Sequence, residues 1–180
     1  MRQRRKAMDP NTIDATSREI FRHLLNSRLW QEAKVIHTFL PQNTEPNTFF
    51  LVQEALQSKR RVQVPKVAGP SHLTHHWLED IKLLKKSLWG IPEIQDSAAS
   101  VADLSKIDLV LVPGLAFSRK GARLGQGRGY YDRFLNQLNG AKTLGVGFDW
   151  QLLEHIPEES HDRRLLGVLT ESQLFWPIGE

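Results

Sequence analysis

Residues 109–114 read Leu-Val-Leu-Val-Pro-Gly and form the most informative stretch for the fold. Residues 109–112 are apolar at every position, and Pro113-Gly114 end the run. A short strand that is apolar on both faces is typical of a parallel sheet that helices cover on both sides. The run is far shorter than the ~18 apolar residues that a membrane span needs. We therefore predict a central buried strand at 109–112.

Helical and extended patterns alternate on both sides of this strand. Asp9-Pro10 read as an N-cap followed by proline at the first helical position, and Ile13, Ile20 and Leu24 then share one helical face. Pro65 indicates a strand end or a sheet edge, and residues 79–102 are loop-rich. Further helices are predicted at 48–59, 130–138 and 151–155, and strands at 35–40, 61–67, 75–78, 143–148 and 167–169, the last of these being the final strand.

This alternation favours an α/β fold with helix–sheet–helix layers and a mainly parallel sheet. We expect a single domain over residues 1–180, in which residues 1–8 form a basic N-terminal arm that leads into the first helix. Ligands in such folds lie beyond the carboxyl ends of the strands. The loop that follows Val112 is therefore the expected site.

The composition excludes several classes of protein. The chain has 24 Lys and Arg against 20 Asp and Glu, and the four excess positive charges lie in residues 1–6. A basic face for nucleic acid is therefore not expected. Cysteine is absent, which excludes disulfides, thiolate nucleophiles and cysteine zinc sites. The first residues lack the apolar stretch of a secretory signal, so we expect a cytoplasmic protein without a membrane segment.

Residues 119–133 form a loop rich in glycine and arginine, Arg-Lys-Gly-Ala-Arg-Leu-Gly-Gln-Gly-Arg-Gly-Tyr-Tyr-Asp-Arg. The alternating Gly125, Gly127 and Gly129 allow the backbone to approach a ligand closely. Their N–H groups can converge on an anion, next to the positive N-terminal end of the helix that follows. The loop therefore predicts a phosphate cradle.

Charged side chains in the same loop support this prediction. Arg123 and Arg128 can donate to phosphate oxygens, and Asp132 can hold a divalent cation beside them. The Walker A pattern does not match, and Tyr130 stands where the dinucleotide fingerprint needs its third glycine. The alternative is a flexible connection with solvated arginines. Three alternating glycines with two flanking arginines favour the cradle.

Other polar groups are weaker candidates. His72, His75 and His76 could bind a metal if they were helical, but the segment looks like a surface strand or loop. Asp162 becomes a metal ligand only if it reaches the site of Asp132. Glu45 alone reads as a solvated loop acid. No Gly-x-Ser-x-Gly elbow exists, so an esterase-type serine is unsupported.

The motifs together resemble a known family. LVLVPGLAF at 109–117, GARLGQGRGYYD at 121–132, WGIPE at 89–93 and His161-Asp162 occur in the order seen in the 5-formyltetrahydrofolate cyclo-ligase family, also called 5,10-methenyltetrahydrofolate synthetase. The resemblance covers about residues 4–171, and its glycine-arginine-tyrosine block is highly specific. It implies a layered α/β fold like that of ribose-phosphate isomerases and CoA transferases.

The resemblance also implies a reaction. The formyl oxygen of 5-formyltetrahydrofolate attacks the terminal phosphate of ATP, a neighbouring folate nitrogen captures the activated carbon, and phosphate leaves. The products are methenyltetrahydrofolate, ADP and phosphate, and Mg²⁺ is required. Phosphoryl transfer depends mainly on positioning and on charge stabilisation. The cradle predicted from the residues fits those needs.

Residue roles follow from the resemblance by position. It implies Arg128 and Tyr130 as catalytic residues and Asp132 and Asp162 as the metal ligands. It places against ATP the loop residues Arg123, Leu124, Gly125, Gln126, Gly127, Arg128, Gly129, Tyr130 and Tyr131. It places around the folate, which can carry a polyglutamate tail, the residues Leu40, Glu45, Trp89, Gln126, Gly127, Arg128, Gly129 and Tyr130.

The sequence departs from the family pattern at two places. A Lys-x-x-Leu-Arg element that contacts the nucleotide in many members is missing, so either the basic arm at 2–6 substitutes for it or the true start lies upstream. Leu166 stands where many members have a second aspartate. We expect a monomeric enzyme. The rivals are an ATP-independent sugar-phosphate isomerase on a related fold and an RNA-binding protein that uses the arm and the glycine loop.

Overall fold

The computed structural model describes residues 1–42, 44–70, 72–87, 90–95, 101–159 and 162–176. Its main sheet has seven strands in the order β12-β11-β9-β6-β1-β2-β3. The five inner strands run parallel, and β12 and β3 close the two edges in the antiparallel sense. The strands of this sheet are β1 (Val35–His37), β2 (Arg61–Val67), β3 (Leu73–Leu78), β6 (Leu109–Pro113), β9 (Lys142–Val146), β11 (Gly167–Leu169) and β12 (Leu174–Phe175).

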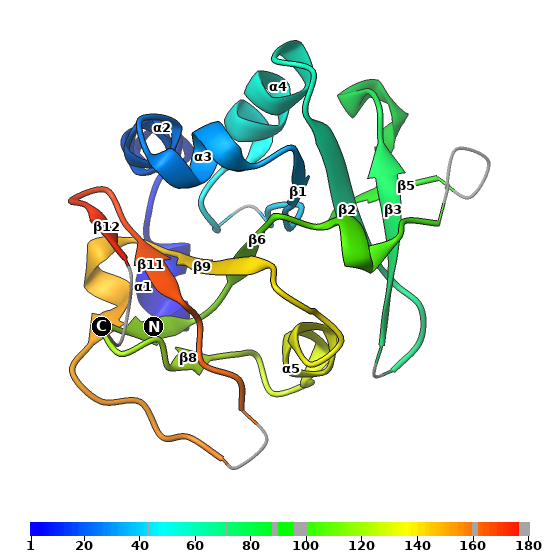
Figure 1. Ribbon diagram of the computed structural model, residues 1–180. Helices are drawn as coiled ribbons and strands as arrows, with labels where there is room; N and C mark the ends of the chain where they lie inside the picture. Colours follow the sequence, from blue (N-terminus) through cyan, green and yellow to red (C-terminus); the bar gives the residue numbers. More distant parts are fainter. Residues whose placement is uncertain (43, 71, 88–89, 96–100, 160–161, 177–180) are drawn as a thin grey trace.

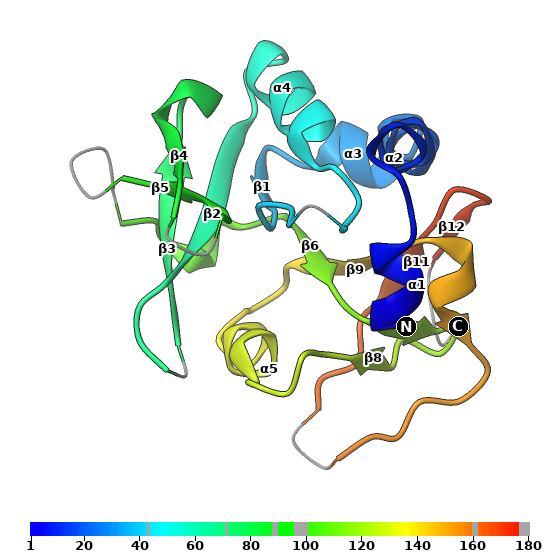
Figure 2. The ribbon, with the colours of Figure 1, turned by 180° about the vertical axis from the view of Figure 1, so that it is seen from behind.

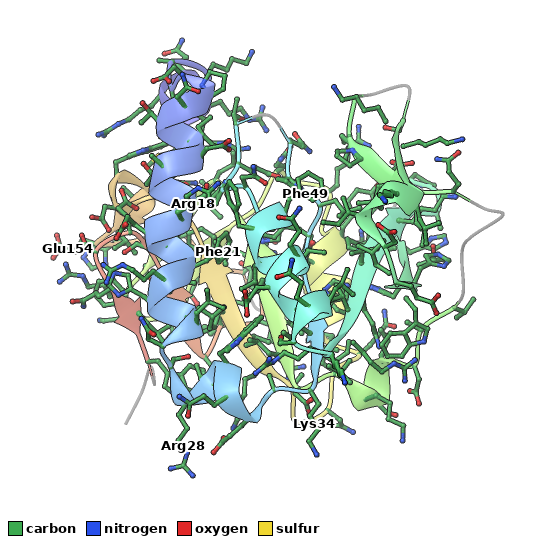
Figure 3. The ribbon with its side chains drawn as sticks, turned by 90° about the horizontal axis from the view of Figure 1, so that it is seen from above. Arg18, Phe21, Arg28, Lys34, Phe49 and Glu154 are labelled. Atoms are coloured by element: carbon green, nitrogen blue, oxygen red, sulfur yellow. The ribbon has the colours of Figure 1, made fainter. Side chains whose placement is uncertain are left out.

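Helices cover both faces of this sheet, as expected (Figures 1 and 2). One face carries α2 (Pro10–Leu25), α3 (Arg28–Glu32) and α4 (Phe49–Gln57), and the other carries α5 (Tyr130–Leu135). Figure 3 looks onto the first face, and Phe21 of α2 is buried in the core that this helix shares with the sheet. None of the helices in the described part of the chain is long and apolar enough to cross a membrane.

Strand β6 occupies the centre of the sheet because its apolar side chains are buried on both faces. Leu109 and Leu111 join the core under α2 and α4, while Val110 and Val112 join the core under α5. All four side chains are almost completely buried. The alternation of a strand thus supplies apolar side chains to two separate cores.

Smaller elements complete the chain. A three-stranded sheet consists of β10 (Leu152–Leu153), β7 (Ala116–Ser118) and β8 (Arg123–Leu124), and a hairpin consists of β4 (Leu84–Lys86) and β5 (Pro92–Ile94). Short 3-10 turns are η1 (Ile81–Leu83), η3 (Leu104–Lys106) and η4 (Asp149–Gln151).

Most boundary predictions hold within a few residues, and four expectations are wrong. The helix expected at 151–155 is replaced by η4 and β10, because Leu152 and Leu153 pair with Phe117 and Ser118. The strand expected at 35–40 ends at His37. Strand β11 is not the last, since β12 returns beside it through the pairs of Val168 with Phe175 and Leu169 with Leu174. The helix expected at 130–138 ends at Leu135.

Pro65 and the start of the chain each need a separate comment on local structure. Pro65 pairs with His75 of β3 beyond the last residue that β1 pairs, so its missing N–H breaks no ladder there. The basic arm expected at residues 1–8 contains a short helix of its own, α1 (Arg2–Lys6), and the Arg5 side chain of this helix is buried.

Candidate functional site

The glycine-rich loop leaves the carboxyl end of the central strand, as predicted. Backbone hydrogen bonds shape it: Leu115 N–H donates to Leu124 O at 2.7 Å, and Gly121 N–H donates to Ser118 O at 3.0 Å. Leu165 N–H donates to Gly121 O at 2.9 Å, which joins the loop to the C-terminal segment. A Cβ at Gly121 would lie 2.2 Å from Leu165 O, so only glycine fits this close contact.

The middle of the loop presents open backbone. Gly127 has φ +90 and no atom within 4 Å of the position that a Cβ would take. Gly129 has φ +61 and is the N-cap of α5, a helix of six residues. The loop turns into α5 through these two left-handed conformations, which glycine adopts without strain. The result is an exposed stretch of backbone at Gly127 with no other group packed against it.

Arg123 and Asp132 form an ion pair across the base of the loop. Arg123 Nη2 lies 2.5 Å from Asp132 Oδ1, and the two side chains are 6% and 17% exposed. The Arg123 guanidinium also lies 5.8 Å from the centre of the Tyr131 ring. The arginine predicted to bind phosphate is therefore already held at the loop by a carboxylate from α5.

Tyr131 connects this ion pair to Glu45. Burial and the negative charge of Glu45 raise the pKa of the Tyr131 hydroxyl well above its ordinary value, against the opposing charge of Arg123. The hydroxyl is buried and has no hydrogen-bond partner among the described residues. A buried phenol that stays neutral is a hydrogen-bond donor, and buried donors in proteins are normally paired with an acceptor.

Glu45 lies in a buried ion pair and is not a solvated loop acid. Only 6% of the residue is exposed, and its Oε1 lies 3.2 Å from Arg5 Nη2. Burial raises the pKa of the Glu45 carboxyl, and the Arg5 charge lowers it in opposition. Leu40, the other substrate residue implied for this segment, is 6% exposed.

The two ion pairs, Arg5 with Glu45 and Arg123 with Asp132, contain two further buried hydrogen-bond donors. Arg5 Nη1 and Arg123 Nε are buried and have no hydrogen-bond partner in the described part of the chain. With the Tyr131 hydroxyl, they make three donors without acceptors in one connected group of side chains. An anion or another acceptor-rich ligand is what such donors require.

The remaining loop residues are more open. Leu124, Gln126 and Arg128 are exposed, and the Arg128 carbonyl accepts a hydrogen bond from Arg133. Tyr130 is half-buried and donates its hydroxyl hydrogen to Gly69 O at 3.0 Å, which attaches the start of α5 to the β2–β3 hairpin. A Cβ at Gly125 would meet Arg123 Nη1 at 2.9 Å, so the guanidinium lies against the loop backbone.

Each of the two predicted metal ligands has a hydrogen-bond partner within the protein. Asp132 Oδ1 accepts from Arg123, while Asp162 Oδ2 accepts from Glu159 N–H at 2.8 Å. The described residues contain no group of three or more His, Asp or Glu side chains placed to hold a metal. Trp89 and His161 lie outside the described residues.

Two of the three histidines in the 72–76 segment, His75 and His76, are buried, and His72 is exposed. His75 Nδ1 lies 2.9 Å from Nε2 of the buried His37, and its ring stacks on Phe134 at 4.2 Å. His76 Nε2 lies 2.9 Å from Thr74 Oγ1. The sequence does not single out His37 or Arg5, because an isolated histidine in a strand and an arginine in a basic run carry no pattern that indicates burial.

The sequence matches one known protein family over nearly its whole length. The model of the 5-formyltetrahydrofolate cyclo-ligase family matches residues 1–171. The chain belongs to the 5-formyltetrahydrofolate cyclo-ligase family. The predicted family and enzyme class are thereby confirmed.

Relatives and solved structures agree with the cyclo-ligase assignment. A probable 5-formyltetrahydrofolate cyclo-ligase of Caenorhabditis elegans is 30% identical over 86% of this chain and 81% of its own length. The cyclo-ligase of Escherichia coli K12 is 29% identical over 97% and 98%. The NMR structure of 5,10-methenyltetrahydrofolate synthetase from Aquifex aeolicus has a TM-score of 0.84 at 24% identity, over 99% of this chain and 89% of that one.

A second solved structure extends the likeness of the fold. The 5,10-methenyltetrahydrofolate synthetase of Mycoplasma pneumoniae has a TM-score of 0.74 at 21% identity, over 94% of this chain and 93% of that one. The layered α/β fold expected from the sequence is therefore the fold of this cyclo-ligase family.

Proposed function

We propose that this chain converts 5-formyltetrahydrofolate to 5,10-methenyltetrahydrofolate, with MgATP as the co-substrate and ADP and phosphate as the other products. Its membership in the cyclo-ligase family supports the reaction class. The structural observation that carries the proposal is the open backbone at Gly127, with Arg123 and Asp132 beside it and the buried Glu45 across from Tyr131.

The loop from Arg123 to Tyr131 is the proposed ATP site. Backbone N–H groups around Gly127 and Gly129 would receive phosphate oxygens, because no side chain occupies that space. Arg123 Nε is a buried donor that still lacks an acceptor. Arg128 is exposed and can reach a phosphate that enters the loop. These groups supply the positive field that phosphoryl transfer needs.

Magnesium fits this site through one carboxylate. Mg²⁺ is usually held by one or two carboxylates together with the phosphates of the substrate. Arg123 engages Oδ1 of Asp132 and leaves the other carboxylate oxygen to a cation. We propose Asp132 as the principal ligand and Asp162 as a second ligand. When bound, Mg²⁺ neutralises phosphate charge.

The proposed folate site lies between Glu45 and the loop. Glu45 and Leu40 would form one wall, with Glu45 accepting hydrogen bonds from the pterin-type ring. Gln126, Gly127, Arg128, Gly129 and Tyr130 would face the folate from the other side. Trp89 remains a proposed wall residue.

The proposed reaction has two steps. The formyl oxygen attacks the γ-phosphorus, a P–O bond forms, and the bond from that phosphorus to ADP breaks. The neighbouring folate nitrogen then attacks the activated carbon and gives up its proton, and the C–O bond breaks as phosphate leaves. Arg128 would stabilise charge on the transferring phosphoryl group, and Tyr130 would fix the start of α5 beside it through its hydrogen bond to Gly69 O. No protein nucleophile is needed.

The setting of this activity is also a proposal. We propose a cytoplasmic monomer that acts on small molecules, including polyglutamated folate, and that binds neither nucleic acid nor membrane. The even charge balance beyond residue 6 supports it.

A spectroscopic assay for methenyltetrahydrofolate tests the proposed function. The protein is mixed with 5-formyltetrahydrofolate, with and without MgATP, and a parallel sample contains ATP and EDTA. Product that requires both ATP and the metal is the expected result. Product without ATP contradicts the ATP-dependent step. A folded sample that neither binds ATP nor forms product contradicts the proposal and favours the isomerase or the RNA-binding alternative.

A further inference from the structure

Arg5 is the buried member of a basic run. Arg2, Arg4 and Lys6 of the same helix are exposed, whereas only 4% of Arg5 is exposed. A guanidinium cannot be deprotonated in a protein, so a buried arginine must find acceptors for its five N–H groups. The acceptors that Arg5 finds show what this side chain does.

The acceptors of Arg5 lie in one short segment that is distant in the sequence. Its Nε donates to Thr44 O at 3.1 Å and to Thr44 Oγ1 at 3.2 Å, and its Nη2 donates to Thr44 Oγ1 at 3.1 Å. The same Nη2 lies 3.2 Å from Glu45 Oε1. One planar group therefore fixes both the backbone of residue 44 and the carboxylate of residue 45.

The Glu45 carboxylate keeps acceptor capacity after these contacts. Oε1 faces Arg5, and Oε2 accepts from Gln42 N–H at 3.0 Å. An ionised carboxylate has about four lone-pair sites, so roughly one site on each oxygen remains open. Two open sites side by side on a buried carboxylate suit a ligand that presents paired N–H donors.

The charged and titratable groups around Glu45 come from different elements. Arg5 of α1 faces Glu45 directly, and Tyr131 of α5 lies near enough for the Glu45 charge to raise the pKa of its hydroxyl. Arg123 of β8 lies by the Tyr131 ring and acts on that hydroxyl in the opposite direction. Burial raises the pKa of Glu45, and Arg5 is the charge that opposes this rise. Without Arg5, the carboxyl group would take up a proton at a higher pH and would lose acceptor capacity.

We propose that Arg5 is a positioning residue for the folate substrate, which holds Thr44 and Glu45 in the geometry that receives the paired N–H donors of the pterin-type ring. This inference rests on the proposed function. It assigns Arg5 to substrate recognition through Glu45 and gives it no part in binding ATP.

Variants of two neighbouring arginines separate this role from a structural one. Arg5→Met removes the donors and retains much of the length and bulk. Arg5→Lys retains a positive charge without the planar fork. Arg4→Met is the matched control, since Arg4 lies on the same helix, is exposed, and stacks 4.9 Å from the centre of the Trp150 ring. Steady-state kinetics for both substrates are measured from pH 5.5 to 8.5, together with thermal midpoints.

The expected result is selective for the folate. Arg5→Met raises KM for 5-formyltetrahydrofolate on the order of 10- to 100-fold, as loss of an ordered charged acceptor implies, and leaves KM for ATP close to that of the parent. The acid limb of kcat/KM for the folate moves to higher pH. Arg5→Lys restores the position of that limb in part, and Arg4→Met changes neither constant. An equal rise in both KM values, or an unshifted acid limb in Arg5→Met, overturns the proposal.

A double variant supplies a second test and covers a variant that folds poorly. If Arg5 acts through Glu45, Arg5→Lys raises KM for the folate clearly in the parent and much less in the Glu45→Gln background. The same increase in both backgrounds overturns the proposal. A parent that binds the folate and turns it over, with Arg5 variants that behave like Arg4→Met, refutes this inference alone. A parent that neither binds the folate in calorimetry nor forms product refutes the proposed function.

Discussion

Arg123 and Asp132 face each other across the glycine loop, with Nη2 of the arginine 2.5 Å from Oδ1 of the aspartate. Each is a residue that the proposed mechanism needs, one for phosphate and the other for the metal. Without ATP and Mg²⁺, the two side chains neutralise each other's charge and hold β8 to α5. We expect MgATP to replace this ion pair by a contact of Arg123 with phosphate and a contact of Asp132 with Mg²⁺.

Asp132→Asn should remove most of the metal-dependent turnover. The amide can still accept a hydrogen bond from Arg123, but it lacks the charge that holds Mg²⁺. We expect kcat to fall on the order of 100-fold, while the free energy of unfolding falls by about 1–2 kcal/mol. Activity titrated against Mg²⁺ checks the first effect, and chemical denaturation checks the second. Asp80→Asn at the exposed cap of η1 is the control, and near-parental turnover in Asp132→Asn would contradict the metal role.

Arg128→Ala should slow the reaction more than it weakens ATP binding. The side chain is exposed before ligands enter, and its charge matters most while the phosphoryl group moves. We expect kcat to fall on the order of 100-fold and the dissociation constant for ATP to change by less than about 5-fold. Pre-steady-state kinetics and calorimetry measure the two effects. Lys120→Ala, exposed in the same loop, should match the parent; unchanged kinetics in Arg128→Ala would place it outside the reacting centre.

Gly127→Val should abolish ATP binding by placing a side chain over the open backbone of the loop. Gly127 has φ +90 with open space around its Cβ position, and Gly140 has φ +80 with the same open space. Gly140→Val is therefore a matched control that carries a similar backbone strain, on the order of 1–3 kcal/mol. We expect calorimetry with ATP to show no binding for Gly127→Val and parental binding for Gly140→Val. Equal ATP affinity in both would mean that the loop is only a turn.

The buried histidine pair should make the fold sensitive to acid. Burial, and then the neighbouring His76, lower the pKa of His75 to about 4. Burial also lowers the pKa of His37 well below its ordinary value. The unfolded chain takes up protons near pH 6.5, whereas the folded chain does not. Their contribution to stability is therefore complete above about pH 6.5 and is lost as the pH falls toward 4.

A pH series of urea denaturation measures this effect. We expect the free energy of unfolding to fall by on the order of 1–2 kcal/mol between pH 7 and pH 5.5. His75→Phe, which preserves the stack on Phe134, should flatten this slope, and the exposed His155→Gln should not. An equal slope in His75→Phe and the parent would show that other groups control the acid response.

The sequence predicts the framework of this fold well because its strongest signals are local. Strand β6 is apolar at every position and needs two covered faces, and Asp9-Pro10 begins α2 where the cap chemistry requires. Residues 151–155 were expected to be a helix because their pairing partners, Phe117 and Ser118, lie more than 30 positions earlier. No local pattern carries that information.

In the candidate site, too, features set by local sequence could be predicted, and contacts between distant residues could not. The glycine loop could be predicted because the conformations of Gly127 and Gly129 depend on residue type alone. The ion pair of Arg5 with Glu45 could not, since both residues carry ordinary surface charges and only the folded chain brings them together. The role of Asp162 as a second metal ligand stays a prediction, because the short His-Asp motif does not encode where Asp162 lies relative to Asp132.

The burial of Arg5 matters for how the protein is handled at the bench. Helix α1 starts immediately after Met1, and Arg5 N–H already donates to Met1 O at 3.0 Å. An affinity tag fused ahead of Met1 would therefore be joined directly to a helix that supports the wall of the proposed folate pocket. Tagged and tag-free enzyme should differ in KM for the folate before they differ in yield or melting temperature. Kinetic constants for this protein are best taken after the N-terminal tag has been cleaved.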